Sequence, residues 1–408
     1  MNEKTRDFIA EHAADDVRQL ALRGCKNPEV DLPFALQQIA GRQAARRKLP
    51  TWAATDGIVF PSHLSLEQCS SEQTARYKAA VARRLMGGTA SSRLPNAKLV
   101  DLTGGFGVDF SFLAPLFREA VYVERNPQLF AISSENFARI GLKADSLHCV
   151  NDDCERYLPM LDHASLLFLD PARRDEHGSR TFAISDCTPD VVALKSPLLQ
   201  KADFVLLKLS PMLDWRKAVA DLGAQHVCEV HIVSVGNECK ELLLVLRENA
   251  DGMSLFCVND DQVLTVSGDR LHASVGLPVS TAAPADMLQS YLYEPNASLM
   301  KAGCFGALSE SYGVCPLAVN SHLFVSPRFI GDFPGRKFKI SAISSMNKRE
   351  LKEKLRHIDK ANVSVRNFPL SVAELRKRLK LSDGGNVYVF ATTLSDDTHV
   401  LMICSPQN

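Results

Sequence analysis

Apolar runs separated by turns of glycine and acidic residues organise the middle of the chain. One run ends at Val100, is followed by Asp101, and breaks into the glycine turn 104–107, after which apolar residues recur at helical spacing from Phe110 to Leu116. This order predicts a strand, a tight turn and then a helix. Glycines let a ligand reach the backbone at the carboxyl end of a strand, because no Cβ lies in its path. We interpret the segment as the first unit of a nucleotide-binding sheet.

Further apolar runs continue the pattern. Strands are predicted at residues 120–124, 146–150, 165–169 and 204–208, followed by a hairpin formed by 227–235 and 242–246. Helical spacing between the strands is typical of a parallel sheet with helices on its faces. The pattern therefore predicts an α/β fold with a Rossmann-like, doubly wound sheet that ends in an antiparallel hairpin.

Helices are predicted before this sheet and small α+β units after it. The predicted division is an N-terminal helical region 1–90, a sheet domain 91–250, a small β-rich domain 251–330 and a last domain 331–408. A chain of 408 residues is long enough for several separate cores.

Composition indicates a folded soluble protein rather than a disordered, membrane or disulfide-rich one. Hydrophobic residues make up 46% of the chain and charged residues 23%. No apolar run reaches membrane-spanning length, and the polar start does not resemble a signal peptide. The eleven cysteines are scattered without a C-x-x-C pair, so we expect reduced core residues and no metal site. A cytoplasmic protein without a membrane partner is the expectation.

Charge is unevenly distributed along the chain, although the formal net charge is zero. Residues 336–380 contain 14 Lys or Arg against four Asp or Glu, a surplus of +10. Such a segment could bind a phosphate backbone. Solvated helix faces that concentrate lysine and arginine are the alternative.

The glycine turn departs from the dinucleotide fingerprint G-x-G-x-x-G, because its third glycine is missing. The carboxylate of Asp101 also suits an amine better than a pyrophosphate. The stretch Asp-Leu-Thr-Gly-Gly-Phe-Gly over 101–107 resembles the first motif of class I S-adenosylmethionine-dependent methyltransferases, with Thr103 where many members have glycine. The resemblance implies a seven-stranded sheet and S-adenosyl-L-methionine as cofactor, held by Asp101, Thr103, Gly105 and Gly107.

Acidic residues follow the second and third predicted strands. Glu124 lies 23 positions after Asp101, a spacing at which its carboxylate could accept hydrogen bonds from both ribose hydroxyls of an adenosine. Asp152 and Asp153 follow the third strand, where members of the family often bind the adenine amino group. Each of these two aspartates could instead cap a helix.

The fourth strand opens directly into Asp170-Pro171, where strands one and four are expected to flank the crevice. The segment resembles the family's fourth motif, Asn or Asp followed by Pro-Pro-aromatic, which holds an amino group for N-methylation. Ala172 and Arg173 replace the second proline and the aromatic. Asp170, also counted among the cofactor residues, and the Pro171 carbonyl are the predicted catalytic groups. Three arginines are candidates for binding a substrate phosphate, with solvated loop charge as the alternative: Arg173, Arg174 and Arg180.

The capped helix predicted to begin at Ser70 or Ser71 resembles a segment of trimethylguanosine-synthase-like methyltransferases that helps to cover the cofactor. A plain packing helix is the alternative. The candidate cofactor neighbours on this segment are Gln68, Ser71, Glu72, Thr74 and Lys78.

The end of the chain extends the resemblance. Residues 360–369, 375–377 and 383–385 are similar to the THUMP-like domain of bacterial class I methyltransferases, and 291–303 resembles the small ferredoxin-like unit that precedes it. THUMP domains are RNA-binding modules, so the resemblance implies an RNA substrate such as rRNA or tRNA. The candidate RNA contacts in this basic part are Lys348, Arg349 and Arg366.

The function predicted from these features is transfer of the sulfonium methyl of S-adenosyl-L-methionine to a nitrogen of an RNA base. Two alternatives stay open. A methyltransferase acting on a protein or a small molecule would use the same cofactor pocket. A non-catalytic RNA-binding protein would explain why Ala172 and Arg173 depart from the motif.

Overall fold

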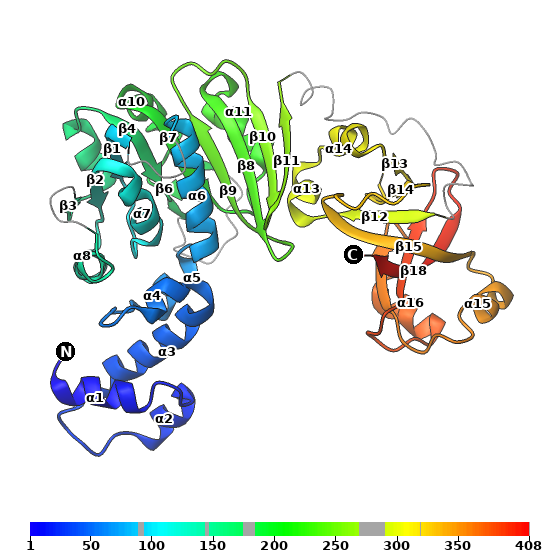
Figure 1. Ribbon diagram of the computed structural model, residues 1–408, viewed down its shortest axis with the longest axis horizontal. Helices are drawn as coiled ribbons and strands as arrows, with labels where there is room; N and C mark the ends of the chain where they lie inside the picture. Colours follow the sequence, from blue (N-terminus) through cyan, green and yellow to red (C-terminus); the bar gives the residue numbers. More distant parts are fainter. Residues whose placement is uncertain (89–93, 143–146, 174–183, 269–289, 319, 408) are drawn as a thin grey trace. The chain divides into compact units, whose positions relative to one another are not determined.

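The computed structural model (Figure 1) describes residues 1–88, 94–142, 147–173, 184–268, 290–318 and 320–407. The chain forms two compact units. The first contains Met1–Cys228 and Leu242–Asp251, and the second contains Glu229–Glu241 and Gly252–Asn408. No helix among the described residues is long and apolar enough to cross a membrane.

The first unit begins with helices, as predicted. They are α1 (Glu3–Glu11), α2 (Val17–Arg23), α3 (Leu32–Lys48), α4 (Pro50–Ala54), α5 (His63–Gln68) and α6 (Glu72–Leu85). The cap residues Asp31 and Ser71 accept backbone N–H groups of the first turns of α3 and α6, which fixes where these helices begin. Trp52 lies buried between them and packs on Phe106 of the glycine turn, with ring centroids 4.9 Å apart. The helical region therefore shares a core with the turn that follows the first strand.

Six strands form the sheet of the first unit. They are β1 (Leu94–Asp101), β2 (Phe117–Val123), β3 (Leu147–Val150), β4 (Ala164–Leu169), β7 (Ala202–Leu209) and β9 (Glu238–Leu246). Their order is β3-β2-β1-β4-β7-β9, and only β9 runs antiparallel to its neighbour. The order reverses beside β1, which pairs with β2 on one side and β4 on the other. Ligands of such sheets bind at this reversal, outside the carboxyl ends of the strands.

Short helices connect these strands and bury their apolar faces. They are α7 (Val108–Leu113), α8 (Pro127–Arg139), α9 (Cys154–Tyr157), α10 (Lys195–Gln200) and α11 (Trp215–Leu222). After β4, the chain forms a two-stranded ladder of β5 (Ala172–Arg173) with β6 (Cys187–Thr188). The predicted Rossmann-like α/β fold is confirmed.

The second unit holds the partner strand of the closing hairpin and a second sheet. Strand β8 (Val227–Val235) pairs in parallel with β10 (Ser254–Asn259), which pairs with β11 (Gln262–Ser267). The second sheet has the order β13-β14-β12-β15-β18-β17-β16. Its strands are β12 (Tyr291–Pro295), β13 (Cys315–Pro316), β14 (Phe324–Ser326), β15 (Gly335–Ser344), β16 (Asn362–Arg366), β17 (Tyr388–Thr393) and β18 (His399–Gln407).

Helices α13 (Ala297–Ala302), α14 (Phe305–Tyr312), α15 (Lys348–Lys354) and α16 (Val372–Leu379) complete this unit. Side chains alternate across the second sheet, so that Phe390 lies in one apolar cluster and Val389 in another. Leu351 of α15 and Leu375 of α16 belong to the same cluster as Val389. Both helices therefore pack on one face of this sheet and project their polar sides from that face.

Candidate active site

Carboxylates lie at the carboxyl ends of β1, β2 and β4, three neighbouring strands in the first unit. Asp101 is the last residue of β1, Glu124 follows β2, and Asp170 follows β4. Asp109, in the first turn of α7, adds a fourth acidic group. We call these four residues the acidic site. Burial and the negative charges of Asp109, Asp170 and Glu124 raise the pKa of Asp101 well above its usual value, although a hydrogen bond from the Thr103 amide opposes the shift.

The glycines of the turn 104–107 are needed for two different reasons. A Cβ at Gly104 would lie 2.0 Å from the Tyr122 ring, and one at Gly107 would lie 2.5 Å from the Phe137 ring. Gly105 has φ +55°, and a Cβ there would meet only the Thr103 carbonyl oxygen, at 3.8 Å. Packing therefore requires glycine at 104 and 107, while Gly105 leaves space above the turn that a ligand can occupy.

Glu124 is held in place by the turn that it faces. Its Oε2 accepts a hydrogen bond from the Gly105 amide at 2.8 Å, and its Oε1 accepts one from the Asn126 amide at 2.7 Å. The residue is 8% exposed. A carboxylate oxygen accepts more than one hydrogen bond, so both oxygens retain acceptor capacity for a pair of hydroxyls. A contact between Glu124 and the ribose of a cofactor stays a prediction.

Asp101 places a buried carboxyl group beside the same turn. The residue is 1% exposed, and its Oδ1 accepts a hydrogen bond from the Thr103 amide at 3.0 Å. A buried carboxylate without a cation is costly. A positively charged ligand group would lower that cost, so this end of the sheet is suited to the sulfonium and amino groups of S-adenosylmethionine.

Asp170 is positioned by Thr103, in the turn after β1, and by Lys208 of β7. Its backbone N–H donates to the Thr103 hydroxyl at 2.6 Å, which links the end of β4 to the turn after β1. Its Oδ2 lies 2.5 Å from the Lys208 Nζ, an ion pair between the ends of β4 and β7. The Asp170 side chain is 34% exposed, whereas that of Lys208 is 13% exposed. A threonine in place of the family's glycine thus has a defined structural role at this site.

Lys208 was not among the residues selected from the sequence. Its ion pair with Asp170 depends on the adjacency of β4 and β7, which their distance along the chain does not reveal. A signal was present nonetheless, because a lysine close to the end of a buried apolar strand needs an anionic partner.

The aspartates after β3 have local partners. Asp153 is the N-cap of α9 and accepts the Glu155 amide at 2.9 Å. Asp152 accepts the Asp153 amide at 2.8 Å and pairs with Arg156, also at 2.8 Å. The capping alternative considered for Asp153 therefore describes its local role, and an adenine contact from either residue stays a prediction.

The start of α6, the helix before β1, is held by contacts of the buried Lys78 side chain. Lys78 is fully buried, and its Nζ lies 3.1 Å from Asp109 Oδ1 and 3.1 Å from Ser70 Oγ. The Ser70 hydroxyl donates to Asp109 Oδ2 at 2.7 Å. Glu72, another residue selected from this segment, accepts from the Thr51 amide and pairs with Arg76. These contacts join α6 to α7 and to α4, in agreement with the alternative of a packing helix.

Cys69 is another titratable group in this region. Burial raises its pKa to about 11, and the charges of Lys48, Asp109, Lys208 and Asp170 also act on it. A thiol with so high a pKa stays protonated near neutral pH and is a poor nucleophile. All eleven cysteines are free thiols, and the described residues contain no group of His, Cys, Asp and Glu that could hold a metal ion.

The predicted substrate residues fall into three groups. Arg173 lies in the β5 ladder, while Arg174 and Arg180 lie outside the described residues. Lys348 and Arg349 are exposed in the first turn of α15. Arg366 is instead paired with the buried Glu294, its Nη2 lying 2.7 Å from Oε1.

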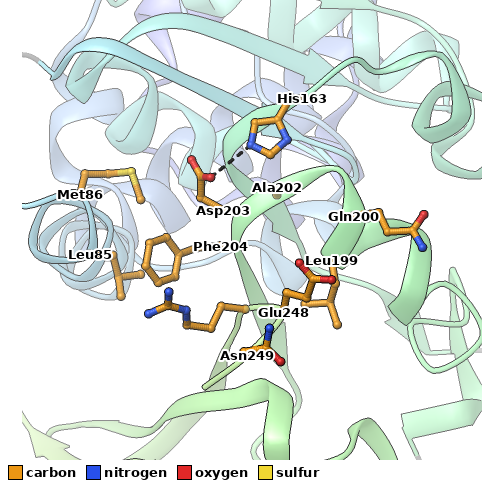
Figure 2. Close-up of a pocket in the computed structure, with 11 residues that line it drawn as sticks. Leu85, Met86, His163, Leu199, Gln200, Ala202, Asp203, Phe204, Glu248 and Asn249 are labelled. Carbon is orange, nitrogen blue, oxygen red and sulfur yellow. Dashed lines mark hydrogen bonds and ion pairs between the residues drawn. The ribbon is translucent and has the colours of Figure 1, made fainter. Parts of the chain in front are cut away.

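A separate hollow of about 600 Å³ lies at the opposite end of the first sheet (Figure 2). It adjoins the amino ends of β4 and β7, and Ala202 is the first residue of β7. Within it, His163 pairs with Asp203 at 3.2 Å, and the Arg247 guanidinium lies 5.5 Å from the centre of the Phe204 ring. The hollow contains none of the residues of the acidic site.

Comparison with known proteins finds matches for the second sheet and for the whole chain. Residues 335–406 match the THUMP domain-like family, and residues 291–334 match a ferredoxin-like domain. A crystal structure from Porphyromonas gingivalis W83, described as that of a methyltransferase, is similar over the full length of both chains, with a TM-score of 0.83 and 30% identity.

A second relative is an uncharacterized S-adenosylmethionine-dependent methyltransferase of Mycobacterium tuberculosis. It is 24% identical over 396 residues, which cover 92% of this chain and 97% of that protein. The same protein in another strain is equally similar. The predicted family, enzyme class and cofactor are thereby confirmed. The chain belongs to the S-adenosylmethionine-dependent methyltransferases that carry ferredoxin-like and THUMP-like domains at the carboxyl terminus.

Proposed function

We propose that this methyltransferase modifies a nitrogen of a base in RNA, with rRNA and tRNA as the candidate substrates. The observation that carries the proposal is a set of exposed cations on α15 and α16, which pack on the same face of the second sheet. We call this set the basic face: Lys348, Arg349, Lys352, Lys377, Arg378 and Lys380. Clustered lysine and arginine side chains on one surface favour a polyanion with regularly spaced phosphates.

The geometry of the acidic site supports the cofactor residues that we propose. Glu124 would accept hydrogen bonds from the ribose hydroxyls, and Gly105 would leave room for the backbone to approach the ligand. Asp101 would complement the positive charge of the ligand. When bound, the cofactor supplies a methyl group on a sulfonium, which needs a nucleophile in line with the carbon–sulfur bond.

Asp170 would orient the target nitrogen. Its Oδ2 is held by Lys208, so the carboxylate has a fixed direction and keeps Oδ1 as an acceptor for a substrate N–H. The Pro171 carbonyl could accept the second hydrogen of an amino group. An exocyclic amino nitrogen is a weak nucleophile, so this alignment of its lone pair is the main contribution of the protein. The proton that leaves the methylated nitrogen passes to Asp170 or to water.

The test is transfer of labelled methyl groups to fractionated cellular material. RNA, protein and small molecules should come from cells that lack this enzyme, so that its target is unmethylated. We expect label in an RNA fraction, and expect Asp170→Ala to remove it. Asp203→Ala is the matched control, because Asp203 is an exposed carboxylate at the amino end of β7, whereas Asp170 pairs with Lys208 near the carboxyl end of that strand. Label confined to protein or small molecules would overturn the proposal and select the corresponding alternative.

A further inference from the structure

A second exposed feature lies at strands β12 and β15 of the second sheet. Phe329 is 41% exposed and packs its ring against Tyr291, the first residue of β12, with ring centroids 5.4 Å apart. A single exposed apolar residue is common on folded proteins, so the groups around this ring decide whether it has a role. This pair lies outside the acidic site and outside the basic face.

The loop that carries Phe329 is fixed from below by a buried tyrosine. The Tyr293 hydroxyl accepts a hydrogen bond from the Ile330 amide at 2.8 Å and donates one to the Arg328 carbonyl at 3.0 Å. Tyr293 is fully buried and packs on Phe333, with ring centroids 4.8 Å apart. The two hydrogen bonds are made by the residues on either side of Phe329. They fix the backbone of the loop there, so the Phe329 ring is held at the surface in a defined position.

Cations accompany the two rings. Tyr291 pairs with Lys339 across β12 and β15, and Tyr293 pairs with Lys337. Alternation along the strands places these lysines on the face opposite to Phe338, which lies in the apolar core. Lys339 is exposed, whereas Lys337 donates to the Gly331 carbonyl at 2.8 Å and so holds the far end of the loop.

Arg328, next to Phe329, is also exposed. Asp332 is the acidic residue of the same loop, and its charge raises the pKa of Tyr312 together with burial, the larger cause. Two aromatic faces beside the cations Arg328 and Lys339 form what we call the aromatic platform. The chemistry fits unpaired bases, which stack on the rings while phosphates contact the cations.

We propose that the aromatic platform binds a single-stranded segment of the RNA substrate, with a base stacked on Phe329. The inference rests on the proposed function, since it names a second contact for the same RNA. Its position supports it, because Tyr291 and Phe329 belong to the ferredoxin-like match and Lys339 to the THUMP-like match, and both matches share one continuous sheet. An apolar protein partner would gain little from the adjacent cations, whereas a nucleic acid uses both groups.

The test compares RNA binding by the full chain and by Phe329→Ala, using a fluorescently labelled single-stranded oligonucleotide over a range of salt concentrations. Stacking of one base predicts a loss of about five- to 150-fold in affinity. The slope of affinity against salt should stay the same, because a phenylalanine neutralises no phosphate. Val263→Ala is the matched control, since Val263 is a 50% exposed apolar residue of the same unit.

A second variant keeps the ring. Phe329→Trp should bind RNA as tightly as the native chain and should show quenching of its added tryptophan fluorescence, since Trp52 and Trp215 are both buried. A native chain that does not bind RNA would overturn the proposed function itself. If the native chain binds RNA but Phe329→Ala binds like Val263→Ala, the aromatic platform is refuted and the RNA substrate stands. An equal loss on a duplex of the same sequence would also refute it.

Discussion

The acidic site and the basic face differ in the burial and pairing of their charged side chains. In the acidic site, Lys78 and Lys208 are almost inaccessible, and each lies within 3.1 Å of a carboxylate oxygen. On the basic face, Lys348 and Lys352 are exposed, and no ion pair with an acidic residue is recorded for them within the described part of the chain. Buried pairs are fixed in direction, whereas exposed charges are mobile and screened by salt.

This difference indicates what each region can recognise. A rigid set of buried charges suits a small ligand whose groups must be placed within a fraction of an ångström. A field of exposed charges suits a polymer that is held by many weak contacts. Removal of one residue should therefore have a large effect in the acidic site and a small one on the basic face.

The largest effect is expected for Asp170→Ala. Loss of the group that orients the nucleophile should lower kcat by about 10²- to 10⁴-fold, the range of catalytic groups that position or accept a proton. Cofactor affinity, measured by calorimetry, should change little, because the proposed function places Asp170 on the substrate side. Comparable loss of cofactor binding, or unfolding detected by circular dichroism, would show that the residue is structural instead.

Replacement of Glu124 by alanine should act on cofactor affinity. Loss of hydrogen bonds to a charged group costs about 1.5 to 3 kcal/mol, which is about 13- to 160-fold in Kd. Glu119→Ala is the control, because Glu119 lies in β2, the strand that Glu124 follows, and pairs with Lys98 at 2.7 Å. An unchanged Kd in titrations of the Glu124 variant would remove the residue from the cofactor site.

Lys208→Met tests positioning rather than chemistry. Without the ammonium, the Asp170 carboxylate loses its fixed direction, and we expect kcat to fall about tenfold. Lys208→Arg should recover most of this loss, since a guanidinium also pairs with a carboxylate. A fall in cofactor affinity as large as the fall in kcat would assign Lys208 to the cofactor instead.

Asp101 predicts a dependence of cofactor affinity on pH. Burial, followed by the charges of Asp109, Asp170 and Glu124, raises the pKa of Asp101 in the free protein. A cationic ligand favours the ionised carboxylate, so binding releases a proton, and Kd should improve by up to about tenfold per pH unit below the raised pKa. The neutral product S-adenosylhomocysteine should show a weaker dependence in the same titrations.

The same shift affects stability with a definite sign. An acid whose pKa is raised on folding stabilises the fold only at low pH, and its contribution is lost as pH rises from its unfolded pKa through the folded one. Asp101→Asn should therefore raise the Tm of the cofactor-free protein at pH 8, with the gain disappearing on acidification. The same Tm difference at every pH would contradict this explanation.

Local signals were sufficient for most of the fold. Gly105 and the acidic strand ends are separated by spacings that define a βαβ unit, so the sequence was enough to predict the order of elements around them. Partners that depend on strand adjacency were not predictable. Lys208 lies 38 residues from Asp170, on the strand that pairs with β4. Long-range contacts between strands that are not neighbours were equally hidden, since Arg366 of β16 lies 72 residues from Glu294 of β12, with which it forms an ion pair. Arg366 therefore looked unpaired in the sequence, although it forms an ion pair with the buried Glu294, and its contact with RNA stays a prediction.

The smallest single effects are expected on the basic face. Each phosphate contact contributes a slope of about −0.7 to the logarithm of affinity against the logarithm of salt, or about fourfold in affinity at 0.15 M salt. Lys348→Gln should therefore weaken RNA binding about fourfold, and a further Arg349→Gln should reduce the slope by about 1.4 in total. Arg376→Gln is the control, because Arg376 lies on α16 but is already paired with Asp383 at 2.6 Å. Cofactor affinity should not change in any of these variants. If the double variant retains the native slope while RNA is still bound, its two cations do not contact phosphate, and the basic face is a solvated surface at these positions.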